Sequence, residues 1–224
     1  MQTPQPNDAL LSRRDFVQIL GTGLLIAATG VPAFSQNRGQ NNRDIALDTR
    51  LHVGKDGIIT VMTGKVECGQ GARAEITQAA AEELGVHPDQ IQLIMADTEL
   101  VPDDGITAGS RTTPSTLPPI RQACATARRL LLEIASLKLD VPFNELKFEN
   151  GAAVHSKDRF TYADLAAASE AVDAFKQNIP HNVTLASVTQ WKVLGTSLPR
   201  PNRGEIVVGK HQYPSDIVRP GMLY

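Results

Sequence analysis

Three glycines surround a glutamate and a glutamine in the stretch Thr63–Gly71, which reads TGKVECGQG. A glycine carries no side chain, so a ligand can approach the backbone closely at these positions. Gln70, between Gly69 and Gly71, offers both an amide donor and a carbonyl acceptor. The stretch therefore predicts a loop that contacts part of a large anionic cofactor. A tight turn between a strand and a helix explains the same glycines and stays open as the alternative.

A second polar region lies at residues 97–113, which lack apolar periodicity. A polar loop of this length in a compact domain is usually functional or disordered. Its hydroxyl groups, the bare backbone of Gly109 and the guanidinium of Arg111 suit hydrogen bonding to a phosphate or a pterin-like ring. An ion pair between Arg111 and a nearby acid is the alternative, and the acids lack the regular spacing of a calcium loop. The hydroxyl-bearing residues are Thr107, Ser110, Thr112 and Thr113, and the acidic ones are Asp97, Glu99, Asp103 and Asp104.

No hydrolytic or metal-binding pattern accompanies these two regions. The five histidines include no H-x-x-H pair, and neither of the two cysteines, Cys68 and Cys124, lies in a CxxC pair. Glu67 is the best-placed carboxylate for an acid or base, but the glycines favour a carboxylate that accepts hydrogen bonds from loop amides. A disulfide between the cysteines requires export and a Cα separation that the sequence does not fix. We therefore predict no catalytic residue and no metal ligand in this chain.

Strand and helix patterns flank the first loop. Residues 51–54 and 58–62 predict two strands joined by Lys-Asp-Gly, a hairpin signal. Residues 72–84 show a helical apolar repeat, and Gly85 is a C-terminal stop signal. The loop thus ends at a helix N-terminus, where free N–H groups favour an anion.

Two further expectations concern this helix and the segment after it. Its glutamates Glu75, Glu82 and Glu83 fall outside the apolar face. Residues 91–96 form a nearly continuous apolar run, which predicts a strand buried on both faces. The order strand, helix, strand indicates a crossover unit, right-handed if the strands are parallel.

The second loop leads into a long helix, expected to begin near Leu117 and to end at Lys138. On its apolar face Cys124 is a small core residue rather than a nucleophile. Since this helix follows the second loop, two helix N-termini are expected to point toward one ligand. Residues 146–154 predict a hairpin with an Asn-Gly turn, and residues 163–172 one small amphipathic helix. The expected fold class is α+β, a small mixed sheet packed with two main helices.

The first 35 residues indicate a targeting segment. Ser12-Arg13-Arg14-Asp15-Phe16 precedes an apolar stretch at residues 19–28 that is too short to span a bilayer, and small residues for cleavage follow at 31–33. The pattern resembles the twin-arginine signal, which exports folded proteins, so we expect a periplasmic location. The alternative is an amphipathic N-terminal helix with two solvated arginines. Residues 36–43 are polar and are expected to be a linker.

Composition excludes few classes of protein. The 224 residues suffice for one large or two small domains, and 42% apolar with 21% charged residues is ordinary for a globular protein. A net charge of −2 gives no reason to expect nucleic-acid binding.

The order of motifs around the two loops resembles a known family. GKVECGQG is followed by TQAAAEELGV at 77–86, by ADT at 96–98 and by TAGSRTT at 107–113. This series looks like the molybdopterin-binding segment of the xanthine dehydrogenase and aldehyde oxidase family. It is closest to the exported branch that includes the large (beta) subunit of isoquinoline 1-oxidoreductase. The resemblance covers most of residues 12–224.

The resemblance implies a cofactor and a set of contacts. The family binds a molybdenum–pterin cofactor, usually as the cytosine dinucleotide in bacteria, and hydroxylates N-heteroaromatics or oxidises aldehydes with oxygen from water. It often has methionine where this chain has Cys68, a difference that we take as tolerated. The expected partners are a 2Fe-2S ferredoxin-like small subunit and a cytochrome c. The residues that match the family's cofactor-binding loops are Gly69, Gln70, Gly71, Thr107, Ala108, Gly109, Ser110, Arg111 and Thr112.

The tail carries a second resemblance. The WKVLG run at 191–195 and the PGML run at 220–223 are similar to the opening of the family's a/b hammerhead domain. We therefore expect a molybdopterin-binding segment at 44–180, then a connection and the start of a hammerhead domain at 181–224. The family's catalytic glutamate lies in a G-x-G-E-type loop that this chain lacks. The expectation is the N-terminal part of a larger subunit, inactive without the remainder. The alternative is an exported noncatalytic module that binds an anionic ligand, or a decayed gene fragment.

Overall fold

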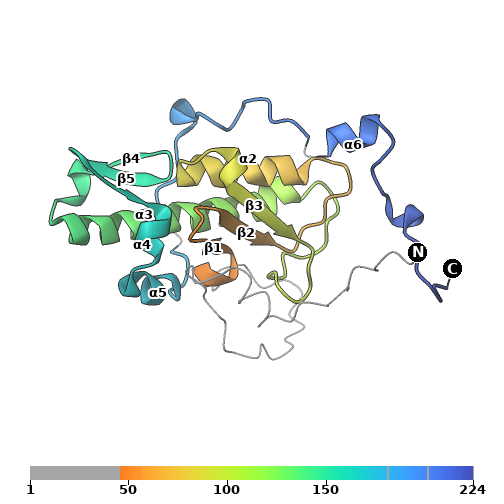
Figure 1. Ribbon diagram of the computed structural model, residues 1–224, viewed down its shortest axis with the longest axis horizontal. Helices are drawn as coiled ribbons and strands as arrows, with labels where there is room; N and C mark the ends of the chain where they lie inside the picture. The colour runs from red at the N-terminus through yellow and green to blue at the C-terminus, as the bar shows by residue number, and fades with distance from the viewer. Residues whose placement is uncertain (1–45, 181, 201, 224) are drawn as a thin grey trace, which may run out of the picture.

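The protein is described by a computed structural model over residues 46–180, 182–200 and 202–223. The expected signal peptide at 1–35 and the linker at 36–43 lie outside these described residues, so both stay predictions. Figure 1 shows a body of helices and two small sheets, with the C-terminal segment extending along one side.

The first sheet forms as the sequence indicates. Strands β1 (Leu51–Val53) and β2 (Ile59–Thr63) are antiparallel, and β2 pairs in parallel with β3 (Ile91–Met95), giving the order β1-β2-β3. Helix α2 (Ala72–Leu84) connects the two parallel strands. It ends where expected, because Gly85 adopts a left-handed conformation that L-residues rarely adopt.

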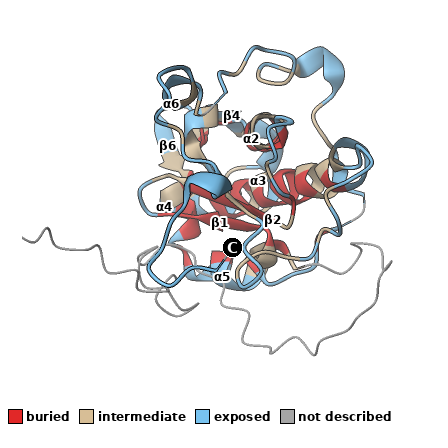
Figure 2. Cartoon of the chain, turned by 90° about the vertical axis from the view of Figure 1, so that its right-hand side faces the viewer, coloured by how far each residue is buried: buried red, intermediate tan, exposed pale blue. Residues whose placement is uncertain are grey.

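The core lies between this sheet and two helices. Helix α3 (Leu117–Leu139) packs against α2, and both cover the sheet face that carries the buried aliphatic side chains of β1 and β2. Cys124 is fully buried on α3, as its spacing predicts. Figure 2 shows buried residues concentrated in α3 and in the first two strands, and exposed ones along the loops and the tail.

A second sheet packs at the C-terminal end of α2. Strands β4 (Lys147–Glu149), β5 (Ala152–His155) and β6 (Asp158–Thr161) form an antiparallel meander. The Asn-Gly turn between β4 and β5 is confirmed, since both residues have positive φ. The hydroxyl of Tyr162, which follows β6, donates to the carbonyl of Leu84 and ties this sheet to α2.

Two expectations for these elements are wrong. The single helix over 163–172 is two helices, α4 (Tyr162–Ala166) and α5 (Ser169–Phe175), because the backbone of Ala168 is extended between them. The hydroxyl of Thr161 caps the start of α4, one residue earlier than expected. Strand β3 is only half-buried, because in the described residues it is an edge strand that pairs with β2 alone.

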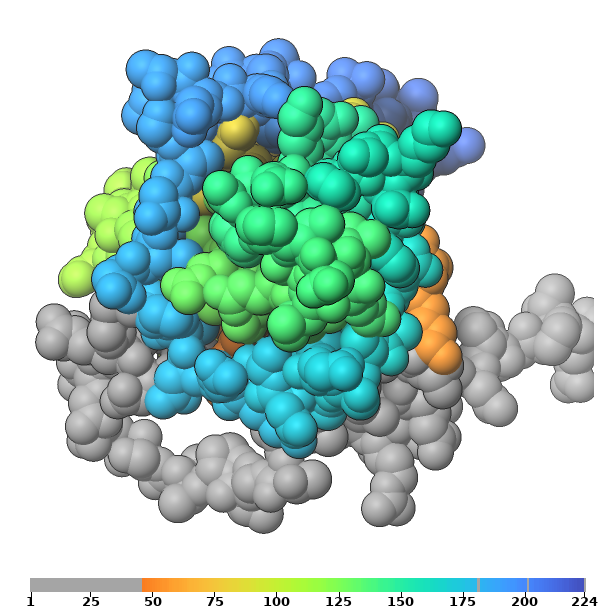
Figure 3. Space-filling view, turned by 90° about the vertical axis from the view of Figure 1, so that its left-hand side faces the viewer, coloured from red at the N-terminus to blue at the C-terminus, as the bar shows by residue number. Residues whose placement is uncertain are grey.

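The tail contains helix α6 (Arg203–Val207) and no strand in residues 182–200 or 202–223. The hammerhead assignment for this part stays a prediction. Residues 182–200 run along the outside of the body and reach α2 (Figure 3). None of the described helices combines the length and apolar character needed to cross a membrane. Short 3-10 turns lie at Leu47–Thr49, Pro88–Gln90, Phe143–Glu145, Val188–Gln190 and Pro214–Asp216, and a π-turn at Thr112–Thr116 precedes α3.

Candidate functional site

The two predicted loops lie side by side where β2 ends. Residues 63–66 and residues 104–107 are joined by five hydrogen bonds, and in each bond the partners are 40 or 41 positions apart. A constant offset means that the two segments run in the same direction, one beside the other. They are linked largely through side chains, beyond the last backbone pairs of β2 and β3. The fold therefore brings together the two regions that the sequence singled out.

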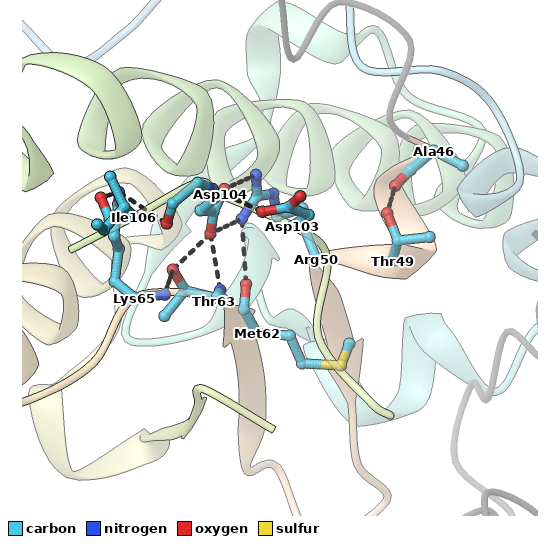
Figure 4. Close-up of polar contacts among 11 residues, drawn as sticks. Ala46, Thr49, Arg50, Met62, Thr63, Lys65, Asp103, Asp104 and Ile106 are labelled. Atoms are coloured by element: carbon cyan, nitrogen blue, oxygen red, sulfur yellow. Dashed lines mark hydrogen bonds and ion pairs between the residues drawn. The ribbon is translucent and has the colours of Figure 1, made fainter. Parts of the chain in front are cut away.

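Asp104 is the buried centre of this junction. Its carboxylate accepts from both terminal nitrogens of Arg50, from the hydroxyl of Thr63 at 2.6 Å and from the N–H of Gly64 at 2.9 Å (Figure 4). Burial alone raises the pKa of Asp104, but the hydrogen bonds and charge of Arg50, with those of Thr63 and Gly64, bring it below its ordinary value. Asp104 is thus an ionised anchor of the second loop.

The other acids of the second loop do not gather around Asp104. Asp97 accepts from the N–H groups of Glu99 and Leu100, and Asp103 accepts from that of Gly105, as is usual in turns. Within the described residues, no three acidic, histidine or cysteine side chains are placed to bind one metal ion.

Gly64 allows the two loops to approach each other. A Cβ at this position would lie 2.6 Å from the carbonyl oxygen of Pro102 and 2.9 Å from the nitrogen of Asp104. Both atoms belong to the backbone, so neither can move without shifting the second loop. The first glycine of the motif is therefore required for contact between the loops.

Glu67 occupies the N-terminus of α2. Its carboxylate accepts from the N–H groups of Gly69 at 2.7 Å, Gly71 at 3.1 Å and Arg73 at 2.8 Å. Partial burial raises the pKa of Glu67, whereas these three bonds and the charge of Arg200 lower it, and the net shift is downward. The expected anion at this helix N-terminus is thus a side chain of the protein, and the interpretation of Glu67 as an acceptor of loop amides is confirmed.

Gln70 also bonds within its own loop. Its carbonyl oxygen accepts from the N–H of Cys68 at 2.6 Å, and its amide nitrogen donates to the carbonyl of Val66 at 2.8 Å. Because a side-chain amide has two N–H groups, one donor remains available on the exposed side of the loop. The thiol of Cys68 is exposed and that of Cys124 is buried, and both are free.

The C-terminal end of the second loop contacts the start of α2. The hydroxyl of Thr113 donates to the carboxylate of Glu75, in the first turn of α2, at 2.5 Å. Residues 108–112 therefore span the distance between the glycine loop and α2. Gly109 and Ser110 both have positive φ, and Arg111 is exposed. Neither Ser110 nor Arg111 has a side-chain hydrogen bond or ion pair with the described residues, so the alternative of an ion pair for Arg111 is wrong for these residues.

Residues 186–200, here called the strap, lie over α2. The carboxylate of Glu82 accepts from three successive N–H groups of the strap, those of Lys192, Val193 and Leu194. Gln78 donates to two further strap carbonyls. Glu82 lies outside the apolar face of α2, as expected, and the strap covers it there.

Glu83 binds the strap at a second point. It is fully buried, accepts from the N–H of Ala186 at 3.0 Å and pairs with Arg121 of α3, whose guanidinium lies 5.6 Å from the ring centre of Trp191. The expectation that Glu83 falls outside the apolar face is wrong, because it lies seven positions after the core residue Ile76 and so on the same face of the helix. Helical periodicity places Glu82 off the apolar face, and only the strap that packs there explains its burial. The contacts come from the WKVLG run: the N–H groups of Lys192, Val193 and Leu194 donate to Glu82, and the ring of Trp191 lies beside Arg121.

The strap leads to a cavity of about 230 Å³ beside the glycine loop. Arg200 lies close to the loop, since a Cβ on Gly69 would be 3.6 Å from its guanidinium. The cavity is lined by Glu67, Gly69, Gly71, Arg73, Ala74, Leu198, Arg200 and Asn202.

Comparison with known proteins gives one family over nearly the whole chain. A family model described as "Molybdopterin cofactor-binding domain" matches residues 7–206. The chain is 32% identical to a subunit of the nicotinate dehydrogenase of Pseudomonas putida over 183 residues, which is 81% of this chain and 15% of that protein. It is 27% identical to the beta subunit of the isoquinoline 1-oxidoreductase of Brevundimonas diminuta, over 98% of this chain and 33% of that protein. The chain therefore spans between about a seventh and a third of these relatives.

A solved structure of a Cu,Mo-CO dehydrogenase is also similar, with 23% identity and a TM-score of 0.49 over 60% of this chain and 18% of that one.

Proposed function

The chain belongs to the molybdopterin cofactor-binding domain family, and we propose that its two loops bind the molybdenum–pterin cofactor of an oxidoreductase. The observation that carries this proposal is the junction of residues 63–66 with residues 104–107, which unites both predicted cofactor-binding loops at one place. Separate loops would supply two weak anion contacts, whereas loops that are joined can contact one ligand together.

The hydrogen-bond donors on these two loops suit a pterin ring that carries a phosphate group. The hydroxyl of Ser110 and the guanidinium of Arg111 lack partners among the described residues, and a guanidinium suits phosphate oxygens. Thr107 accepts from the N–H of Val66 at 3.0 Å, so its own proton is free to be donated. Gln70 keeps one amide N–H. In our proposal these donors bind the cofactor, with the backbone of Gly69, Gly71, Ala108, Gly109 and Thr112.

The bound cofactor would supply two-electron oxidation with oxygen from water. The role of this chain would be to bind and orient the cofactor. The two carboxylates at the loops are poor general bases, since Glu67 and Asp104 each accept several hydrogen bonds and both pKa values are lowered. We therefore propose that proton abstraction from substrate needs a residue outside the described loops, and that the chain alone is inactive.

Finer features of the proposal come from the relatives. Nicotinate dehydrogenase and isoquinoline 1-oxidoreductase are named for N-heteroaromatic substrates, and an aldehyde oxidase of Macaca fascicularis is 30% identical over 38% of this chain. We propose N-heteroaromatic hydroxylation or aldehyde oxidation for the complete enzyme. The cofactor would be the cytosine dinucleotide form. The partners would be the remainder of the large subunit, a 2Fe-2S small subunit and a cytochrome c.

Export is proposed on the sequence alone. Arg13 and Arg14 precede an apolar stretch in residues that the structure does not describe. Replacing both by lysine should prevent export through the twin-arginine pathway, and fractionation of cells into periplasm and cytoplasm would measure it. If the double variant reached the periplasm in the same amount as the wild type, the twin-arginine signal would be contradicted.

Cofactor binding is tested by metal content. The full chain, produced in a bacterium that makes the cytosine dinucleotide cofactor, should copurify with molybdenum and pterin, measured by mass spectrometry and by pterin fluorescence. Arg111→Ala should lower both about tenfold, the effect of losing one charge-assisted hydrogen bond. Arg129→Ala is the matched control, because Arg129 lies on α3 and, within the part of the chain that the structure describes, its ion pair is with the surface residue Glu133. Absence of molybdenum from the wild-type chain would overturn the proposal.

A further inference from the structure

Lys65 is a buried lysine at the junction of the two loops. Its side chain is only 2% exposed. Its ammonium donates to the carbonyls of Ile106 at 2.8 Å and Gly105 at 3.3 Å, and it forms no ion pair within 4 Å among the described residues. Burial of an ammonium away from a carboxylate is costly, and an apolar side chain of the same length would fill the space without that cost. Packing alone therefore does not account for an ammonium at this position, and its two hydrogen bonds to the second loop are the contacts that an apolar side chain could not make.

Lys65 lies between two other contacts that join the glycine loop to the second loop. Thr63 and Gly64 bind the second loop at Asp104, and Val66 binds it at Thr107. Between these points only Lys65 contacts the loop, at the two consecutive carbonyls. Without its ammonium, residues 105 and 106 would be fixed only by their neighbours.

The direction of these carbonyls decides which way the loop faces. Gly105 and Ile106 both turn their carbonyl oxygens toward the buried ammonium, and Ile106 is 78% exposed. Thr107 follows at once, with its hydroxyl fixed by Val66. The orientation of residues 107–112, which bear the unpartnered Ser110 and Arg111, thus depends on a preceding segment that Lys65 fixes.

We propose that Lys65 is a positioning residue, whose buried ammonium fixes the second loop against the glycine loop and so sets the geometry of the cofactor-binding surface. This inference rests on the proposed function. Lys65 acts through the loop and does not touch the cofactor. Its loss should therefore weaken cofactor retention while leaving the core intact, since the bonds of its ammonium go to the second loop at Gly105 and Ile106.

The test compares Lys65→Met with Lys55→Met in the full chain. Methionine keeps the length and removes the donor, and Lys55 is an exposed lysine in the β1–β2 turn. Molybdenum release from the purified protein should be about tenfold faster in Lys65→Met, the effect of losing a hydrogen bond from a charged donor. The melting temperature should change by only about 2 °C, because methionine fills the same space and removes the cost of burying an ammonium. The Lys55→Met protein should match the wild type in both measurements.

Amide hydrogen exchange in the cofactor-free chain separates this inference from the proposed function. In Lys65→Met the amides of residues 104–110 and of Val66 should exchange about tenfold faster, while those of α2 and α3 stay unchanged. Failure of the wild type to bind molybdenum would overturn the proposed function, whereas unchanged exchange in these loops would overturn the role of Lys65. Normal molybdenum retention in a folded Lys65→Met protein would also overturn it.

If Lys65→Met does not fold, the adjacent bond gives the test. Thr107→Val removes the hydroxyl that accepts from Val66, and Thr107→Ser keeps it. The readout is amide exchange in the cofactor-free chain, because the Thr107 hydroxyl is itself proposed to contact the cofactor. Faster exchange at Val66, Gly105 and Ile106 in the valine variant, restored by serine, supports positioning by these hydrogen bonds between the loops. Equal exchange in both variants overturns it.

Discussion

The carboxylate of Glu67 accepts a hydrogen bond at 2.8 Å from the backbone N–H of Arg73, six residues further along and inside the first turn of α2. The residue before α2, Gly71, has no side chain that could cap the helix. Glu67 reaches over the intervening glycines and does so instead. The glycine loop is therefore ordered by its own carboxylate before any ligand arrives.

Removal of this carboxylate should loosen the start of α2. Glu67→Gln keeps the size of the side chain and loses the charge at the helix N-terminus, so we expect a loss of about 1 kcal/mol in the free energy of unfolding, as for other caps. Urea unfolding at pH 7 measures it. Glu99→Gln, on an exposed turn, is the control. An unchanged free energy in Glu67→Gln would show that the three N–H bonds do not stabilise the folded chain.

The same variant predicts a dependence on pH. The pKa of Glu67 is lowered on folding, so its contribution is fully present above the unfolded-state pKa, about 4.3, and is lost as the pH falls through the lower folded-state value. The stability difference between wild type and Glu67→Gln should therefore be constant from pH 7 to about pH 5 and shrink below it. Unfolding curves at intervals of pH test this. A difference that grows on acidification would contradict it.

Asp104 should be far more important than its neighbour Asp103. Removing the Asp104 carboxylate leaves the guanidinium of Arg50, only 1% exposed, without its buried partner, which typically costs about 3–5 kcal/mol. Asp103→Ala removes only one bond on an exposed turn, so it should cost about 1 kcal/mol or less. Chemical unfolding of both variants gives the comparison. Equal losses would show that the Arg50 contact does not anchor the loop.

The contrast between these two acids shows what the sequence could predict. Alternating and helical apolar patterns placed β1, β2, α2 and α3 within one or two residues, because those elements bury regular faces. The loops were located from glycines and hydroxyls. The pattern could not say that Asp104 turns inward while Asp103 stays exposed, since no periodicity governs an irregular loop and the partner Arg50 is 54 positions away.

The strap gives the second example. Helical periodicity places Glu82 off the apolar face of its own helix. Its burial depends on a segment more than 100 positions further on, whose backbone N–H groups need acceptors. Long-range contacts of this kind leave no repeat in the sequence, so only the fold reveals them.

Glu82→Gln should release the strap without unfolding the body. The amide oxygen is a weaker acceptor than the carboxylate that now accepts from Lys192, Val193 and Leu194. We expect about tenfold faster hydrogen exchange at these three amides and unchanged exchange in α3. Glu133→Gln, which affects only a surface pair on α3, should leave strap exchange unchanged. Unaltered exchange at Val193 in Glu82→Gln would contradict the role of Glu82 as the main strap contact.

Gly64→Ala tests whether the two loops need their close approach. The added Cβ would lie 2.6 Å from the carbonyl oxygen of Pro102, and this overlap should cost about 1–3 kcal/mol because the backbone has to shift. Gly204→Ala is the matched control: nothing lies within 4 Å of its Cβ position, and its φ does not require glycine. Urea unfolding and exchange at the amide of Gly105 measure the two effects together. Since the clash is with the second loop, exchange should rise there first, and a Gly64→Ala chain as stable as Gly204→Ala, with an unaltered Gly105 amide, would show that the loops do not depend on this contact.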